Sequence, residues 1–155
     1  MEKLLIIVAA ISLLAVVALF VMGYWSKSGE APGLVDGRLQ QCPGTPNCVS
    51  SEFEADAAHH VEPLVFSAEQ AAEVLPRLKA VIDEMGGSVL VEETAYLAAT
   101  FTSSIFGFVD DLELRIDAEQ NTIHLRSASR VGRSDLGANR DRVERFKRLF
   151  HSKTG

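Results

Sequence analysis

A long apolar run with one polar interruption, Ser12, lies near the start of the chain, and apolar and polar positions alternate only after it. Residues 4–24, LLIIVAAISLLAVVALFVMGY, contain no charged side chain. At about 1.5 Å per residue, a helix of this length matches the roughly 30 Å hydrocarbon core of a bilayer. Tyr24 and Trp25 follow where amphipathic aromatic side chains favour the membrane–water interface. We therefore predict that residues 1–27 form a transmembrane signal anchor.

A cleaved signal peptide is the alternative for this run. The apolar region of such a peptide spans about 7–15 residues and ends in a small-x-small cleavage site. The run here is longer, and it ends in Val-Met-Gly-Tyr-Trp without an Ala-x-Ala sequence. The pattern favours an uncleaved anchor.

Two later segments have helical periodicity. In residues 68–85 apolar positions recur at three- and four-residue steps, after Ser67, which can cap the helix. Pro76 lies inside this segment and predicts a kink or a split. A second helix is expected to start near Ser134 or Asp135. Its apolar stripe consists of Leu136, Val143, Phe146 and Phe150.

Five shorter segments have the composition or the alternation of strands, namely residues 64–66, 88–93, 96–102, 112–117 and 123–126. Alternation of apolar and polar positions indicates antiparallel strands with one packed face and one wet face. The order of elements predicts an α+β domain in which a mainly antiparallel sheet is packed by two helices. We assign this domain to residues 38–151. Residues 28–37, rich in Gly and Pro, are expected to form a flexible linker.

Charge divides the domain unevenly. Residues 28–125 contain four Lys and Arg against seventeen Asp and Glu, whereas residues 126–155 contain nine Lys and Arg against three Asp and Glu. A basic end of a chain often indicates nucleic acid, but an exported domain rarely meets any. We expect the basic segment to pack on an acidic sheet, and we expect no nucleic-acid partner.

Cys42 and Cys48 are the only cysteines and flank a loop stiffened by two prolines, CPGTPNC. They can close a disulfide in an oxidising compartment; two free thiols or half of a metal site are the alternatives. Metal is the least favoured, since no further cysteine completes a zinc ribbon. The pattern predicts a disulfide, an N-terminus in the cytoplasm, and a domain on the periplasmic or extracytoplasmic side of the inner (plasma) membrane.

Three stretches carry a resemblance to a known family: CPGTPNCVSS, DDLELRI and RSASRVGRSDLGANRDRVERF. They resemble the bacterial domain-of-unknown-function family 1499, over most of residues 39–150, and the last stretch is fairly specific. The resemblance implies a small α+β domain, often membrane-anchored or exported, and implies no activity.

The last stretch, residues 126–146, is named the closing motif here and is the candidate binding site. Gly132 and Gly137 permit unusual backbone dihedrals beside a helix start, where free amides and the helix dipole favour an anion. Arginine makes bidentate contacts to phosphate or carboxylate. The predicted ligand-binding residues are Arg130, Arg133, Ser134, Asp135, Asn139, Arg142 and Asp110.

The same residues also allow a structural network. In that interpretation Asp135 caps the helix, Arg130 or Arg133 pairs with an acidic residue of the sheet, and Asn139 holds the loop backbone. Asp110 lies two residues before Leu112 and four before Leu114. In a strand its side chain therefore points to the same packed face as these leucines. A carboxylate on a packed face needs a partner, and a motif arginine is the obvious one. Both interpretations can hold together.

Three functions follow from these observations. The first is a membrane-anchored binding module of the cell envelope for a small anion, a lipid headgroup or an envelope component. The second is a protein–protein interaction or assembly factor, because residues 103–109, SSIFGFV, offer an apolar contact surface or a membrane-dipping loop unless they form a buried connection. The third is an envelope hydrolase with Asp110 or His124 as base.

Catalytic signatures are weak in this sequence. It has no Walker loop, dinucleotide fingerprint, His-Glu-x-x-His or Gly-x-Ser-x-Gly motif. His59 and His60 lie near carboxylates, but adjacent histidines on a loop are not forced to converge on a metal. We expect a non-catalytic protein with no cofactor and no metal.

Overall fold

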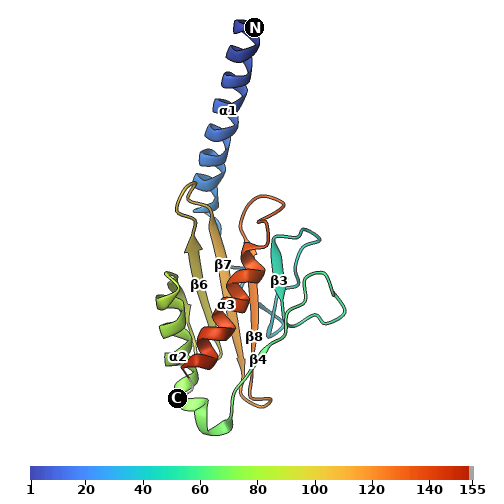
Figure 1. Ribbon diagram of the computed structural model, residues 1–155. Coiled ribbons are helices and arrows are strands. Elements are labelled where there is room, and N and C mark those ends of the chain that lie inside the picture. Colours follow the sequence, from blue (N-terminus) through green and yellow to red (C-terminus); the bar gives the residue numbers. More distant parts are fainter. Residues whose placement is uncertain (154–155) are drawn as a thin grey trace.

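Helix α1 (Glu2–Ser26) stands away from the rest of the fold in the computed structural model, which describes residues 1–153 (Figure 1). Its side chains are exposed along nearly the whole length, and only Gly23 and Ser26 are buried. By length and composition the helix is able to cross a membrane. A helix that is apolar all round and leaves its side chains uncovered fits association with a membrane.

A six-stranded sheet forms the centre of the domain, with strand order β3–β8–β7–β6–β5 and with β4 also paired to β8. Every strand pair in it is antiparallel. The long strands are neighbours in sequence and in space, because tight connections join them as a meander. Their bounds are β3 (Cys48–Ser50), β4 (Leu64–Val65), β5 (Ser88–Glu92), β6 (Tyr96–Thr102), β7 (Val109–Asp117) and β8 (Thr122–Ser129).

Two helices cover one face of this sheet, α2 (Ala71–Glu84) and α3 (Ala138–Ser152) (Figure 1). The 3-10 turn η1 (Ala68–Gln70) precedes α2, so the predicted helix is split before Ala71, while Pro76 lies inside α2. The predicted α+β class, with an antiparallel sheet packed by two helices, is confirmed. The fully buried core residues between the helices and the sheet include Leu78, Val81, Ile82, Leu112, Leu114, Ile123, Leu125, Val143 and Phe146.

The start of α3 differs from the prediction. The helix begins at Ala138 rather than at Ser134 or Asp135, because Leu136 (φ 55°) and Gly137 (φ 89°) have left-handed backbones. Such dihedrals do not belong to a right-handed helix. Leu136 is therefore not part of the buried stripe of α3 and is 97% exposed.

The second face of the sheet, predicted to be wet, is covered in part: Leu39 packs against Tyr96 and Ala98, whereas Leu90 of β5 is 60% exposed. Residues 28–41 run across it and carry a small hairpin of β1 (Leu34–Val35) and β2 (Arg38–Leu39). The Gly33 amide donates a hydrogen bond to Glu113 Oε1 at 3.0 Å. Part of the segment assigned to a flexible linker thus contacts the sheet, and the domain boundaries themselves stay a prediction.

Under this cover lies a buried charged cluster. Glu113 is 0% exposed, and its carboxylate accepts hydrogen bonds from Tyr96 Oη (2.8 Å) and Arg126 Nη1 (2.7 Å). Alternation in the sequence marks these positions as polar, but it does not show that they pair with one another beneath another segment. Burial, followed by the Glu113 charge, raises the pKa of the Tyr96 phenol above its ordinary value.

Candidate functional site

The closing motif runs along the end of β8, through a loop, and into α3. Its loop (residues 130–137) lies at the same end of the sheet as the C-terminal end of α1 and the loop between β6 and β7 (Figure 1). Three segments that are far apart in the sequence therefore meet at this end of the domain.

Arg130 joins the sheet to α1. Its guanidinium contacts Asp111 at two points, with Nε 2.9 Å from Oδ2 and Nη2 2.7 Å from Oδ1. Nη1 also donates to the carbonyl oxygen of Ser26, the last residue of α1, at 3.3 Å. Both charged side chains are nearly buried. Arg130 thus has the acidic partner on the sheet that the structural interpretation requires.

Asp110 has an arginine partner of its own. Arg142 Nη2 lies 2.6 Å from Asp110 Oδ2, and the Arg142 guanidinium stacks 5.0 Å from the centre of the Phe101 ring. Asp110 and Arg142 come from β7 and α3, so the pair ties the helix to the sheet. The parity argument placed Asp110 on the helix-covered side, which is where this partner reaches it.

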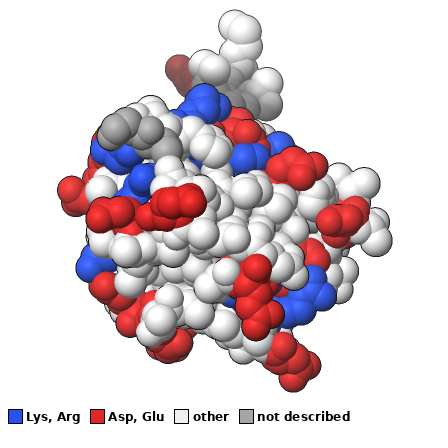
Figure 2. All heavy atoms as spheres, turned by 90° about the horizontal axis from the view of Figure 1, so that it is seen from below, with Lys and Arg blue, Asp and Glu red and all other residues white. Residues whose placement is uncertain are grey.

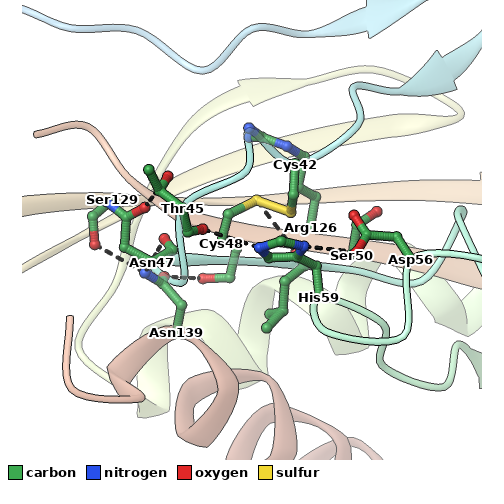
Figure 3. The surroundings of a disulfide bond; sticks show 12 residues. Cys42, Thr45, Asn47, Cys48, Ser50, Asp56, His59, Arg126, Ser129 and Asn139 are labelled. Carbon is green, nitrogen blue, oxygen red and sulfur yellow. Dashed lines mark hydrogen bonds and ion pairs between the residues drawn. A yellow bond between two sulfur atoms is a disulfide. The ribbon is translucent and has the colours of Figure 1, made fainter. Parts of the chain in front are cut away.

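Asn139 is the most connected side chain of the motif and is 1% exposed. Its carbonyl oxygen accepts from Ser127 Oγ (2.6 Å) and from Arg142 Nη1. Its amide nitrogen lies within hydrogen-bond distance of the Asn47 carbonyl oxygen (3.1 Å) and Ser129 Oγ (2.9 Å) (Figure 3). The side chain therefore holds together the start of α3, the end of β8 and the cysteine loop.

Asp135 occupies the place at the helix start that the sequence suggested for an external anion. Its Oδ1 accepts from the Gly137 amide (3.0 Å) and its Oδ2 from the Asn139 amide (2.7 Å). Ser134 Oγ in turn accepts from the Leu136 amide at 3.4 Å. The amides that open α3 are thus satisfied by the chain itself, as in a side-chain cap. This geometry leaves no free helix-start amides at these positions for an anion.

Arg133 differs from the other predicted arginines. It is exposed, and within residues 1–153 it has no ion pair or side-chain hydrogen bond. It borders a cavity of about 370 Å³ between α1 and the closing motif. The cavity is lined by Leu19, Met22, Ser103, Phe108, Val109, Asp110, Ser129, Val131, Gly132, Arg133, Ser134, Asp135 and Ala138.

The two walls of this cavity differ in chemistry. Leu19 and Met22 of α1, with Phe108 and Val109, form an apolar wall. The polar part of the lining carries the hydroxyl groups of three serines, the carboxylates of Asp110 and Asp135, and the Arg133 guanidinium. Such a combination of a broad apolar surface with a few convergent polar groups is typical of ligand pockets. The sequence does not predict Leu19 and Met22 as lining residues, because a uniformly apolar helix gives no sign of which side chains contact the domain.

The cysteine loop is closed by the predicted disulfide. Cys42 and Cys48 are bonded, with their Cα atoms 5.7 Å apart (Figure 3). Cys48 lies in β3 opposite Ala128 of the closing motif. The disulfide therefore supports the strand that borders the motif, and its presence indicates an oxidising compartment.

Asn47 connects this loop to the closing motif and was not predicted. Its carbonyl oxygen accepts from the Ser129 amide (3.0 Å) and from Asn139 Nδ2 (3.1 Å). Its own Nδ2 donates to the Gly132 carbonyl oxygen at 3.0 Å. The loop of Gly132 is thus held by a residue 85 positions earlier. A signal was available in the sequence, since a lone Asn between a proline and a disulfide cysteine is well placed to bond backbone groups.

The other face of the sheet carries a second charged cluster around Glu52. Burial raises the pKa of the Glu52 carboxyl, but hydrogen bonds from Arg115 and Arg38 outweigh it, so this pKa lies below its ordinary value. His124 lies beside this cluster, with Nδ1 3.3 Å from Ser51 Oγ. Burial and the nearby Arg115 charge lower the pKa of His124.

The residues considered for catalysis or metal binding are kept apart. Asp110 pairs with Ser129 in the sheet and faces the helices, whereas His124 pairs with Arg115 nearer the other end of the same strands. Asp110 and His124, the alternative bases of the hydrolase hypothesis, therefore lie at different places in the sheet, and the hypothesis stays a prediction. His59 contacts Asp56 Oδ1 (2.8 Å), and in the described part of the chain no group of three or more His, Cys, Asp and Glu is placed to hold a metal ion (Figure 3).

The apolar stretch 103–109 contacts α1. The centre of the Phe106 ring lies 5.2 Å from the centre of the Phe20 ring, in an edge-to-face arrangement, and 6.2 Å from the centre of the Phe108 ring. A Cβ atom added to Gly23 would lie 1.9 Å from the Phe106 carbonyl oxygen, so glycine allows this close approach. The assembly-factor hypothesis stays a prediction, with part of its motivating surface engaged by α1.

Comparison with known proteins agrees with the resemblance seen in the sequence. The family model described as "Protein of unknown function (DUF1499)" matches residues 38–150. Among curated proteins no relative matches the chain. The match covers the sheet, both packing helices, the cysteine loop and the closing motif. This chain therefore belongs to the DUF1499 family of proteins of unknown function.

Proposed function

We propose that this protein is a single-pass, membrane-anchored binding module that takes an anionic lipid headgroup into the cavity between α1 and the closing motif. In this proposal α1 is an uncleaved signal anchor, and the domain lies on the extracytoplasmic side, which is the periplasm in a Gram-negative cell. The protein is a binding module and not an enzyme.

Contacts at the end of α1 support an uncleaved anchor. Ser26 Oγ accepts a hydrogen bond from the Val109 amide at 2.9 Å and donates one to the Gly23 carbonyl oxygen at 2.6 Å. Arg130 reaches the Ser26 carbonyl oxygen from the motif. Cleavage after the apolar run would remove partners from buried groups of the domain, which is costly. The disulfide supports placing the domain in an oxidising compartment.

The cavity beside α1 is the observation that carries the proposal. Its apolar wall includes Leu19 and Met22, which belong to the last turns of the predicted anchor. The cavity therefore opens at the level where a bilayer places headgroups next to the first acyl carbons. A ligand with a polar head and an apolar tail matches both walls.

The charge of the ligand follows from which groups are already paired. Asp110 is neutralised by Arg142, and Asp135 is occupied by backbone amides of α3. Arg133 lines the cavity and has no ion pair or side-chain hydrogen bond within residues 1–153. An unpaired guanidinium favours a phosphate or a carboxylate, which it can contact with two donors.

Native mass spectrometry of the full chain tests this proposal. The protein is released from detergent that contains anionic and zwitterionic phospholipids in equal amounts. We expect retention of an anionic lipid by the wild type and a loss of roughly 10- to 100-fold in its affinity for Arg133→Ala, because a charged hydrogen bond contributes about 1.5–3 kcal/mol.

Arg145→Ala is the matched control. Arg145 is exposed on α3, does not line the cavity, and its loss changes the net charge by the same amount. Equal lipid retention by wild type, Arg133→Ala and Arg145→Ala would contradict the proposed site. An equal loss in both variants would show only a general charge effect and would also contradict it.

A further inference from the structure

We infer that the loop between β6 and β7, residues 103–108, is a second membrane-inserted element, which enters the outer edge of the hydrocarbon beside α1 and fixes the orientation of the domain on the bilayer. This inference rests on the proposed anchoring by α1. It goes beyond the lipid-binding cavity, because it assigns a bilayer contact to the tip of the loop, whereas only Ser103 and Phe108 at the two ends of the loop line that cavity.

The depth of the loop follows from its contact with α1. The Phe106 ring packs on Phe20, and its backbone touches α1 at Gly23. Phe20 precedes the exposed interfacial residues Tyr24 and Trp25 by four and five positions. At about 1.5 Å per residue, Phe20 lies about 6–8 Å before them along the helix axis, inside the apolar part of the anchor. A loop that touches the helix at this level is within the membrane whenever α1 spans it.

The side chain at the tip of the loop is uncovered. Ile105 is 71% exposed, although its neighbour Phe106 packs on α1. A large β-branched apolar side chain at a loop tip gains nothing from water, and in the acyl region it becomes buried. The occupant of this surface is the bilayer that holds α1, since the two apolar surfaces are continuous.

The backbone of the loop is suited to an environment without water. The Ser103 amide donates to the Phe108 carbonyl oxygen (2.8 Å), and the Gly107 amide donates to the Ser103 carbonyl oxygen (3.1 Å). Ser103 Oγ accepts from the Phe108 amide at 3.0 Å. Lipid offers no partners to backbone groups, so internal hydrogen bonds lower the cost of insertion. Gly107, with φ 70°, closes this turn.

The opposite end of the domain has a different surface. Figure 2 looks at that end and shows acidic and basic side chains interspersed around an uncharged centre. Val65, 65% exposed, lies there on β4 and pairs with Thr122, at the start of β8. Ser129 at the motif end of β8 is seven residues away, which corresponds to about 23 Å along the strand. Val65 is therefore an exposed apolar position far from the inferred bilayer.

Fluorescence quenching of the full chain in liposomes tests the inference. Ile105→Cys, Val65→Cys and Ile11→Cys each introduce one free thiol, because both native cysteines form the disulfide. Each variant is labelled with a small fluorophore without reductant. Quenching is then measured with nitroxide-labelled phosphatidylcholine and, separately, with aqueous iodide. All three positions are exposed, so the label replaces no core contact.

The expected result is several-fold stronger lipid quenching at Ile105→Cys than at Val65→Cys, together with weak iodide quenching. Ile11→Cys, in the middle of α1, reports on the anchor itself. If Ile11→Cys is quenched by lipid while Ile105→Cys is as open to iodide as Val65→Cys, this inference is wrong and the anchor stands. Shielding of Ile105→Cys from both quenchers would indicate a protein partner and would also overturn it. If lipid does not quench the label at Ile11→Cys, both the proposed anchor and the inferred loop insertion are wrong.

Discussion

Removing the Asn139 carboxamide is expected to destabilise the domain by about 4 kcal/mol. Asn139 Nδ2 has two hydrogens for three acceptors, Asn47 O, Ser129 Oγ and Asp135 Oδ2. The Asn139→Ala variant loses two of these hydrogen bonds and the one from Ser127, at about 1 kcal/mol each, and the contact with the Arg142 guanidinium, at about 2 kcal/mol. The higher helix propensity of alanine returns about 0.6 kcal/mol. The net loss is a large part of the roughly 5–15 kcal/mol that stabilises an ordinary domain.

Thermal unfolding of the full, oxidised chain in detergent, followed by calorimetry, measures this loss. For a domain of this size 1 kcal/mol corresponds to roughly 3–5 °C, so we expect a Tm decrease of about 12–20 °C. Arg145→Ala, exposed on the same helix, is the control and should stay within about 0.5 kcal/mol of the wild type. A loss below about 1 kcal/mol in Asn139→Ala would refute the reasoning, since water would then replace the carboxamide without cost.

Three further predictions concern other parts of the fold. Replacing Cys42 and Cys48 with Ser should lower the free energy of unfolding by about 2–3 kcal/mol, from the entropy of a short closed loop, as measured by urea denaturation. Because the pKa of His124 is lowered in the fold, the unfolded chain binds the proton first as pH falls below 6.5. The wild type should therefore lose stability below that pH, and His124→Gln should lose less; equal pH profiles would contradict this. Gly23→Val should push α1 from the Phe106 carbonyl and speed limited proteolysis in residues 103–108, while unchanged cleavage would argue against that contact.

Local periodicity accounts for what could be predicted of the fold. Each of these patterns belongs to one helix or strand: the apolar run of α1, the three- and four-residue steps of α2, and the alternation in β7 and β8. Such a pattern can be recognised without knowing which segment the element packs against. The start of α3 was placed too early, because Ser134 and Asp135 have the side chains of a helix cap. The left-handed backbone at Leu136 prevents the helix from starting before Ala138, and a leucine in the sequence does not indicate such a conformation.

For the candidate site, the sequence located the closing motif and the residue types in it, but not their partners. Arg130 and Arg133 are both motif arginines on one short loop, yet Arg130 is bonded to Asp111, nineteen positions away, and to Ser26, 104 positions away. Arg133 has no such partner in the described chain and faces the cavity beside α1. The sequence by itself therefore determined α2, the strands β5 to β8, the long apolar helix near the N-terminus and the disulfide pair, since these depend on short repeats and on residue type. Only the tertiary structure decided which arginine is free, how Glu113 is buried, and that α1 forms a wall of the cavity, because these depend on strand register and on packing between distant segments.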